Sequence, residues 1–370
     1  MAFSDILKLK KEEQKKEETI FVRNLIVGSD IFTVALVKKL ADKFQDSLKV
    51  LSEASFTLDN IKSLGPYGIR GDENINALAS DFTLEDKQSS HSVFYKEMKF
   101  HKFHSRSKPM KLLEGENYYT QKHLKVDEAE LLDITESDLG LVNDVLIENR
   151  IASIDKLESS ELLDKKEWAV RCTNGLIIEC ENLYWGEGAF RFYDLLNDKN
   201  ILGTDTVEYL ESTKTPLALY VNLNFEKPVI DMGETIFFPL SFTHDWGHFI
   251  GDVISSNEGQ VARFVTFVDK EESSEEDISK KIRLLKKNIE KNFESFKAVN
   301  YTEQVILNES SPCSKIDDGK LDPKELEQIH LHFYSYNAPL FNKSEEESND
   351  ADSCFSPSYF TRGYLALKNI

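Results

Sequence analysis

The segment NLIVGSDIFTVALVKKL, residues 24 to 40, carries the strongest structural signal in this chain. An apolar strand ends at Gly28, and the apolar residues that follow recur with helical spacing as far as Leu40. A second apolar strand, LKVLSEA, comes next at residues 48 to 54. Because two parallel strands must be joined by a crossover, this order predicts a βαβ unit whose strands are neighbours in a parallel sheet.

The turn between the first strand and the helix has the geometry that binds a dinucleotide pyrophosphate at a helix N-terminus. Such turns carry two further glycines, one for the approach of backbone to the pyrophosphate and one for close helix–strand packing. Asp30 and Thr33 stand in their places here. Asp30 puts a negative side chain where the diphosphate would lie. We therefore expect it to cap the helix, accepting hydrogen bonds from backbone N–H groups near Phe32 or Thr33.

The composition predicts a soluble, acidic, cytoplasmic protein. The chain has 370 residues, 40% of them hydrophobic, which suits two domains or one large domain with an insertion. A net charge of −20 argues against nucleic acid and against an anionic membrane surface, since both are negatively charged. The cysteines lack CxxC spacing, as expected in a reducing cytoplasm. They are Cys172, Cys180, Cys313 and Cys354.

The N-terminal residues lack the apolar core of a signal peptide. The longest apolar-rich run, IFTVALV at 31 to 37, is too short to cross a bilayer. Residues 8 to 18 are almost wholly charged, and we interpret them as a solvated helix or arm, with a protein-binding arm as the alternative.

The order of the later segments predicts an α/β fold, with a discontinuous, Rossmann-like parallel-sheet domain and a β-rich α+β second domain. In this division a charged arm (1–19) precedes the Rossmann-like domain (20–75, 165–205 and 325–370), and the second domain comprises 76–164 and 206–324. An acidic loop is expected at 342–353. In the second domain, a helix over 275–296 should bury Ile282, Leu285 and Ile289 and expose Lys286 and Lys287.

A hairpin is predicted around Asn174-Gly175, where strand-like alternation surrounds a turn signal. A two-residue turn would pair Thr173 with Leu176, and would set Cys180 opposite Ala169. Cys172 would then face Ile177, so we expect no disulfide between the two cysteines.

The segment LIVGSDIFTVALVKKL…KVLSEA resembles the opening of the FAD-dependent amine oxidase and protoporphyrinogen oxidase-like superfamily, of which this chain would be a degenerate member. The later hairpin and NLYWGEGAFRFYDLL resemble the return of those proteins to the nucleotide domain. The resemblance implies that Gly28 and Ser29 would lie against the pyrophosphate. It also implies that Glu53, 25 residues after Gly28, would hold the adenosine ribose.

The departures from the family concern function. The family carries an arginine and paired glycines just after the ribose acid, whereas here SFTLDNIKS follows and Arg70 is seventeen residues from Glu53. Ahead of the last helix the family usually has a Gly-Asp that touches the cofactor, and this chain has YSYNAPL. We therefore expect a non-catalytic binding or scaffold protein without cofactor. An FAD-dependent oxidoreductase with non-standard contacts is the alternative, in which the flavin would do the redox chemistry. No catalytic residue can be transferred.

Other motifs favour ordinary structural interpretations, and we expect no metal site. His244, His248 and Asp252 are spaced by four, but Gly247 and Gly251 argue against the helix that this spacing needs. The pairs His330/His332 and His101/His104 have no third ligand nearby. Residues 314 to 326 imitate half of a calcium loop and are better explained by a helix that starts at Pro323. An aromatic run from Phe237 to Trp246 indicates core, or the lining of a substrate cavity.

Overall fold

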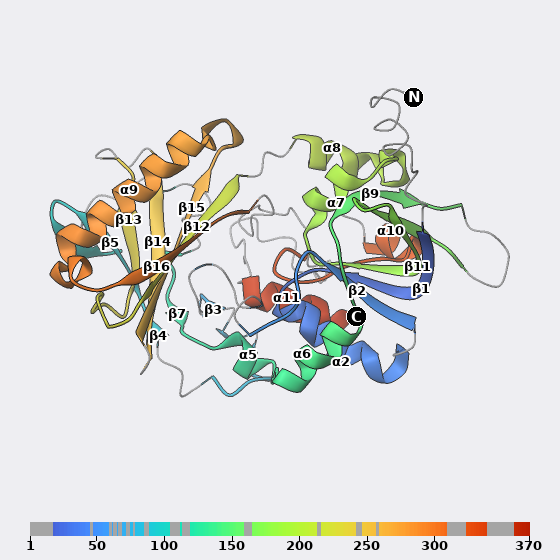
Figure 1. The fold of residues 1–370 in the computed structure, drawn as a ribbon, viewed down its shortest axis with the longest axis horizontal. Helices are drawn as coiled ribbons and strands as arrows, with labels where there is room; N and C mark the ends of the chain where they lie inside the picture. Colours follow the sequence, from blue (N-terminus) through green and yellow to red (C-terminus); the bar gives the residue numbers. More distant parts are fainter. Residues whose placement is uncertain are drawn as a thin grey trace, which may run out of the picture.

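The computed structural model describes residues 18–370 except for the following segments: 45–46, 59–60, 62–64, 66–68, 72–74, 77, 85–88, 104–111, 113–118, 159–164, 213–215, 242–245, 257–258, 309–322 and 339–358. The expected acidic loop and nearly all of the N-terminal arm therefore lie outside the described residues, as do His104, His244, Cys313 and Cys354. Two large sheets lie beside each other, each covered by helices (Figure 1).

The first sheet contains the predicted βαβ unit. Its strand order is β8-β2-β1-β11-β10-β9, and β17 adds to β11. β1 (Glu18–Val27) and β2 (Leu48–Ser52) are parallel neighbours, and α2 (Ile31–Phe44) connects them. β11 (Leu176–Trp185) lies parallel to β1 on its other side. This arrangement confirms the α/β class with a Rossmann-like sheet.

Helices cover both faces of this sheet because successive residues of β1 point to opposite sides. Ile26 packs in a cluster with α2, α6 (Glu136–Asp144) and α11 (Tyr359–Asn369). Leu25 and Val27 pack on the other face with α7 (Ala189–Leu195), α8 (Thr204–Ser212) and α10 (Pro323–Gln328). Figure 1 shows the two helical layers on either side of the blue and green strands.

Two further strands of this sheet come from the stretch 76–164, which the sequence places in the second domain. β8 (Leu146–Glu148) pairs with β2, and β9 (Ile151–Lys156) pairs with β10 (Trp168–Cys172). Leu139 and Val142 of α6 also pack on the α2 side of the sheet. The domain boundaries as a whole stay a prediction.

The hairpin of β10 and β11 has a different register from the predicted one. Cys180 lies opposite Trp168, not Ala169. Gly175 adopts a φ of 94° and donates to the Cys172 carbonyl at 3.0 Å, so three residues form the loop. A loop that ends on a left-handed glycine is the second common hairpin solution, and it shifts the pairing by one residue. Both cysteines are buried free thiols.

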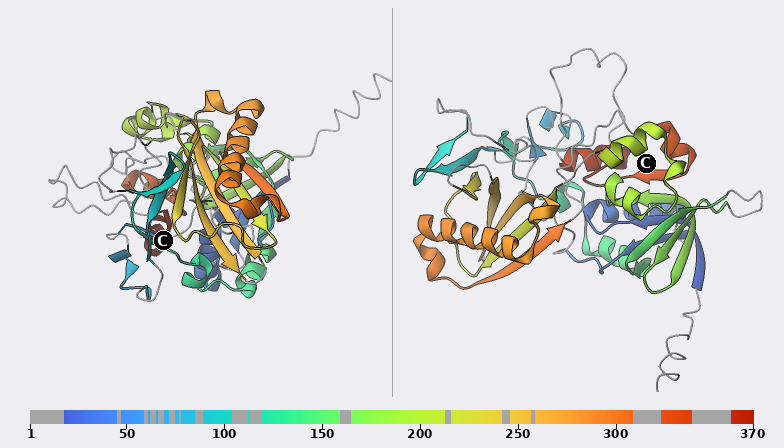
Figure 2. Two further views of the ribbon diagram at one scale, coloured as in Figure 1. Left: turned by 90° about the vertical axis from the view of Figure 1, so that its left-hand side faces the viewer. Right: turned by 90° about the horizontal axis from the view of Figure 1, so that it is seen from above.

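The second sheet has the order β16-β12-β15-β14-β13-β5-β6, and Figure 2 shows α9 lying over it. Its strands are β5 (Ser92–Lys96), β6 (Lys99–Lys102), β12 (Leu217–Phe225), β13 (Thr235–Pro239), β14 (His248–Ser256), β15 (Gly259–Val268) and β16 (Tyr301–Asn308). A small third sheet holds β3 (Ile69–Arg70), β7 (His123–Leu124) and β4 (Ser89–Ser90). These elements confirm a β-rich second region with helices.

The long helix of the second region, α9 (Glu275–Asn292), buries the predicted face. Leu285 and Ile289 are fully buried, and Ile282 packs against the same cluster while partly accessible. Lys287 is exposed, whereas Lys286 is half-buried because it pairs with Glu303 of β16. Phe237 and Phe238 are fully buried core residues on opposite faces of β13.

The described residues also form short 3₁₀ helices at Lys199–Ile201, Lys270–Glu272 and Glu294–Lys297. A further α-helix is α5 (Glu128–Leu131), which Asp127 caps through Ala129 and Glu130. Within the described part of the chain, no helix combines the length and the apolar character needed to cross a membrane.

Candidate functional site

The candidate site lies where the parallel strands β1, β11 and β17 (Leu331–Phe333) end side by side. The Gly186 N–H donates to the Val27 carbonyl at 2.8 Å, and the Tyr334 N–H donates to the Trp185 carbonyl at 3.1 Å. These bonds bring the turn after β1 next to the segments that follow β11 and β17. Ligands of open α/β sheets bind at this edge, outside the carboxyl ends of the strands.

Asp30 caps α2 as the sequence predicts. Its carboxylate accepts from the Thr33 backbone N–H at 3.0 Å and from the Thr33 hydroxyl at 3.2 Å. Its second oxygen accepts a hydrogen bond from the Ser335 hydroxyl. Burial raises the pKa of the Asp30 carboxyl, and the bonds from Ser335 and Thr33 act in the opposite direction. A protein carboxylate thus takes the place of an anion at this helix start.

Tyr334 occupies the space over the glycine turn. Its ring is fully buried, and its hydroxyl donates to the Val27 carbonyl at 2.9 Å and lies 2.9 Å from the Thr33 hydroxyl. A Cβ atom on Gly28 would fall 2.6 Å from the Thr33 Oγ and closer still to the Tyr334 hydroxyl. A Cβ atom on Gly186 would meet the Tyr334 ring at 2.7 Å. Both glycines are therefore needed to seat this tyrosine, whether or not a ligand binds.

Ser335 holds the segment after β17 against the turn. Its backbone has a φ of 77°, which is uncommon for a residue other than glycine. Its hydroxyl donates to Asp30 and accepts from the Tyr336 N–H at 2.6 Å. These two bonds fix Ser335 in the left-handed conformation and connect β17 to the start of α2.

The other predicted cofactor residues are farther from this contact. Ser29 is exposed beside Gly28. Glu53 is exposed just after β2, and its carboxylate lies 3.7 Å from the Arg150 guanidinium. The structure thus brings Gly28 and Ser29 together at the turn and leaves Glu53 at the end of the neighbouring strand. Their assignment to a cofactor stays a prediction.

Arg70 lies away from the turn, in the second region. Its guanidinium is 3.3 Å from Asp252 and donates to the Thr235 hydroxyl at 3.3 Å. The Thr235 hydroxyl also donates to Asp252 and lies 3.1 Å from His123 Nε2. Burial, followed by the charge of Arg70, lowers the pKa of His123 to about 3, so the imidazole is neutral at pH 7. Arg70 and Asp252 form a buried ion pair, which explains their position without a cofactor.

Carboxylates surround the closed turn. Burial raises the pKa of Glu187, and the neighbouring charges of Glu53 and Asp30 raise it further. Burial also raises the pKa of Glu128 to about 7, although the Tyr336 hydroxyl donates to it at 2.5 Å. A diphosphate placed here would add negative charge to a region that already disfavours it.

The histidines take structural positions. His248 is fully buried at the start of β14. This segment is a strand, whereas histidines and an aspartate spaced by four would need a helix to share a metal ion. His332 stacks on Tyr184 with ring centroids 4.8 Å apart, and His330 lies 3.1 Å from the Asn182 side chain. Within the described residues, no group of three or more His, Cys, Asp or Glu side chains is placed to hold a metal ion.

Sequence reasoning missed the residues that close the site. Tyr334 and Ser335 occupy the segment YSYNAPL, where the family usually has its Gly-Asp. The loss of that pair was a visible signal. The segment carries a bulky tyrosine where the family usually has a glycine nearby. Its sequence does not say where that ring goes, because only the pairing of β17 with β11 places the ring over Gly28.

No family model matches the chain, and no curated protein matches it in sequence. Solved structures do match in fold. An oxidoreductase from Methanosarcina mazei has a TM-score of 0.53 at 8% identity, over 94% of this chain and all (100%) of that one. A putrescine oxidase triple mutant, redesigned in cofactor binding, has a TM-score of 0.51 at 10% identity, over 95% and 98% of the two chains. Reduced UDP-galactopyranose mutase has a TM-score of 0.50 at 8% identity, over 85% and 90%.

The chain has an FAD-binding, amine-oxidase-like fold. The resemblance inferred from residues 24 to 54 is thereby confirmed for the architecture of nearly the whole chain. At these identities the likeness shows the fold alone, so the chemistry must be judged from the side chains of this protein.

Those side chains do not fit a dinucleotide pyrophosphate. The Tyr334 side chain lies against Gly28 and Gly186. In a nucleotide-binding turn, glycines at such positions leave room for the phosphates to approach the backbone. Asp30 already accepts from the helix N-terminus, whose free N–H groups would otherwise bind the anion. Like charges ~4 Å apart in a partly screened site cost on the order of a few kcal/mol. The fold of these neighbours is present, and Tyr334 and Asp30 contact its nucleotide turn from within the chain.

Proposed function

We propose that this chain is a non-catalytic binding protein built on the flavoprotein fold and working without FAD. The observation that carries the proposal is the position of Tyr334, whose hydroxyl bonds to Val27 and whose ring contacts the turn. The hydrogen bonds of Asp30 to Thr33 and Ser335 support it, because they supply internally what a phosphate would supply.

The test is the visible spectrum of the purified protein together with a thermal-shift titration with FAD. We expect a colourless protein whose melting temperature does not change. A site filled at a hundred times its dissociation constant would stabilise the native state by ~2.7 kcal/mol, which is easily measured. A putrescine oxidase treated in parallel is the positive control. Stoichiometric flavin in the purified protein would refute the proposal.

The second candidate is an FAD-dependent oxidoreductase of the amine-oxidase type. The fold comparisons favour it over a scaffold, because the neighbours above are themselves oxidoreductases or a related mutase. It would require Tyr334 and Ser335 to leave the turn, with Gly28, Ser29 and Glu53 holding the cofactor. Flavin that stays bound through gel filtration would refute the cofactor-free proposal and favour this candidate.

A further inference from the structure

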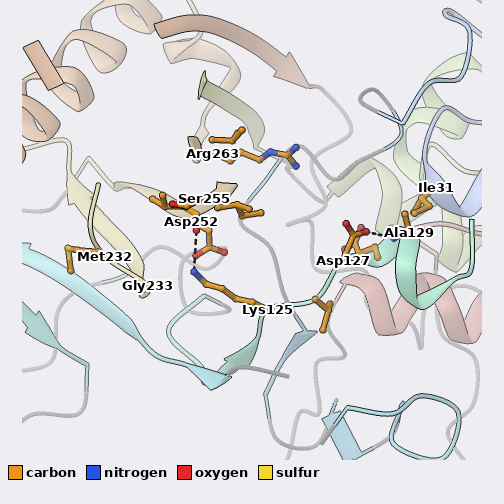
Figure 3. A pocket seen from close by; sticks show the side chains of 14 residues that line it. Ile31, Lys125, Asp127, Ala129, Met232, Gly233, Asp252, Ser255 and Arg263 are labelled. Atoms are coloured by element: carbon orange, nitrogen blue, oxygen red, sulfur yellow. Dashed lines mark hydrogen bonds between the residues drawn. The ribbon is translucent and has the colours of Figure 1, made fainter. Parts of the chain in front are cut away.

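A cavity of about 530 Å³ lies between the two large sheets. One wall is formed by β14 and β15, and the opposite wall is formed by the start of α2 and the segment 125–129 (Figure 3). Its volume is within the range of small-molecule sites. Much of its lining is apolar, and Ile254 keeps 41% of its surface accessible there. An apolar side chain left accessible in a concave wall is suited to contact an apolar ligand.

The carboxylates that line the cavity already have partners in the protein. Asp252 pairs with the buried Arg70. Asp127 accepts from the backbone N–H groups of Ala129 and Glu130, at 2.9 and 3.3 Å. Glu128 accepts from the Tyr336 hydroxyl. Asp252 and Asp127 thus direct their negative charge to groups of the protein. Burial raises the pKa of Glu128 to about 7, so this third carboxyl is mostly neutral below that pH.

Lys125 is the cation with unused bonding capacity. Its ammonium donates one long hydrogen bond, 3.4 Å, to the Val253 carbonyl, and within the described residues it forms no ion pair. Figure 3 shows it extending from the segment before α5 toward β14. Arg263 adds a second positive charge to the lining. An ammonium has three donors and is compatible with a carboxylate at this wall.

We propose that this cavity binds a small amphipathic carboxylic acid, with its carboxylate on Lys125 and its apolar body against Val253, Ile254 and Val261. The proposal rests on the proposed function, since it names what a binding protein of this fold would bind. The proposed ligand is an anion, unlike a cationic amine. At long range the net charge of −20 would attract an amine, so the preference for a carboxylate comes from Lys125 at short range.

The test compares three probes that share a ten-carbon chain: decanoate, decylamine and decanol. Binding is measured by isothermal titration calorimetry at pH 6, where Glu128 of the lining is mostly protonated, and below the concentrations at which the probes aggregate. We expect decanoate to bind most tightly. Lys125→Gln should weaken decanoate at least about tenfold and change decanol little, because only the charge-assisted bond is lost. Lys287→Gln, which removes an exposed lysine of α9, is the matched control and should leave all three affinities unchanged.

A second pair of variants tests the location of the site independently of charge. Gly233 lines the cavity, and a Cβ atom added there meets no heavy atom within 4 Å. Gly233→Leu should therefore fold normally and weaken decanoate and decanol alike. Gly140 is equally open but lies on the exposed face of α6, so Gly140→Leu should change neither affinity.

Decylamine binding as tightly as decanoate would overturn the proposal. So would decanoate binding that survives both Lys125→Gln and Gly233→Leu. The outcome is separable from the FAD test, because the probes contain no nucleotide and none of these substitutions touches Tyr334, Asp30 or Gly28. Flavin in the purified protein together with a Lys125-dependent decanoate site would refute the proposed function and leave this inference standing.

Discussion

Removal of the Tyr334 hydroxyl alone measures how firmly the chain closes its own nucleotide turn. In Tyr334→Phe the ring still fills the space over Gly28, but the hydrogen bond from the hydroxyl to the Val27 carbonyl, 2.9 Å long, is lost. The Val27 carbonyl is not orphaned, because it still accepts from Gly186, and the Thr33 hydroxyl keeps its bond to Asp30. The loss is then one ordinary net hydrogen bond, and we expect the free energy of unfolding to fall by about 0.5–1.5 kcal/mol.

The assay is urea denaturation of the wild type and of Tyr334→Phe, monitored by tryptophan fluorescence. The two free energies are compared when the dependence on urea concentration has the same slope in both proteins. Tyr95→Phe is the matched control, because Tyr95 is also a buried ring but its hydroxyl has no hydrogen bond within the described residues. A Tyr334→Phe protein no less stable than Tyr95→Phe would refute the reasoning, since the hydroxyl could not then be bonded in the turn.

Two further predictions concern stability away from Tyr334. Burial raises the pKa of Glu128 from 4.5 to about 7, so the stability that its protonated form contributes is complete below pH 4.5 and is lost as the pH rises through 7. Glu128→Gln should therefore be more stable than the wild type by about 1–3 kcal/mol at pH 8 and equal to it near pH 4. Urea denaturation across this pH range measures the difference. A constant difference at all pH values would contradict this pKa. Gly140→Ala should add about 0.5–1 kcal/mol to the unfolding free energy, because Gly140 is an exposed residue inside α6 with open space at its Cβ; calorimetry showing a loss would contradict the helical assignment there.

The first strand, helix and second strand could be predicted from the sequence because their signals are local. The apolar spacing from Gly28 to Leu40 fits one helix, and a short polar connection returns the chain to a parallel strand. The same holds for the buried stripe of Leu285 and Ile289 on α9 and for the capping of α2 by Asp30, which acts on an N–H three residues away. In each case neighbours in sequence are neighbours in space.

Other features were decided by tertiary structure. The hairpin register depended on Gly175 adopting a left-handed conformation, which an Asn-Gly signal leaves open between two loop lengths. β8 and β9 joined the first sheet by pairing with distant strands, and short strands carry little periodicity of their own. The segment around His248 became a strand because its edges pair with β13 and β15.

The state of the nucleotide turn shows the division most clearly. The turn, the replacement of two of its glycines and the capping of the helix by Asp30 could all be predicted from residues 24 to 40. The sequence by itself did not determine what fills the space over Gly28, because Tyr334 is 307 positions from the carbonyl that it contacts. Only the parallel pairing of β17 with β11 carries Tyr334 to that position, and only close packing against two glycines lets its ring stay there. The spacing of apolar residues predicted the strand, turn and helix of the site. The contact of Tyr334 with Val27, far apart in the sequence, filled the space over the turn.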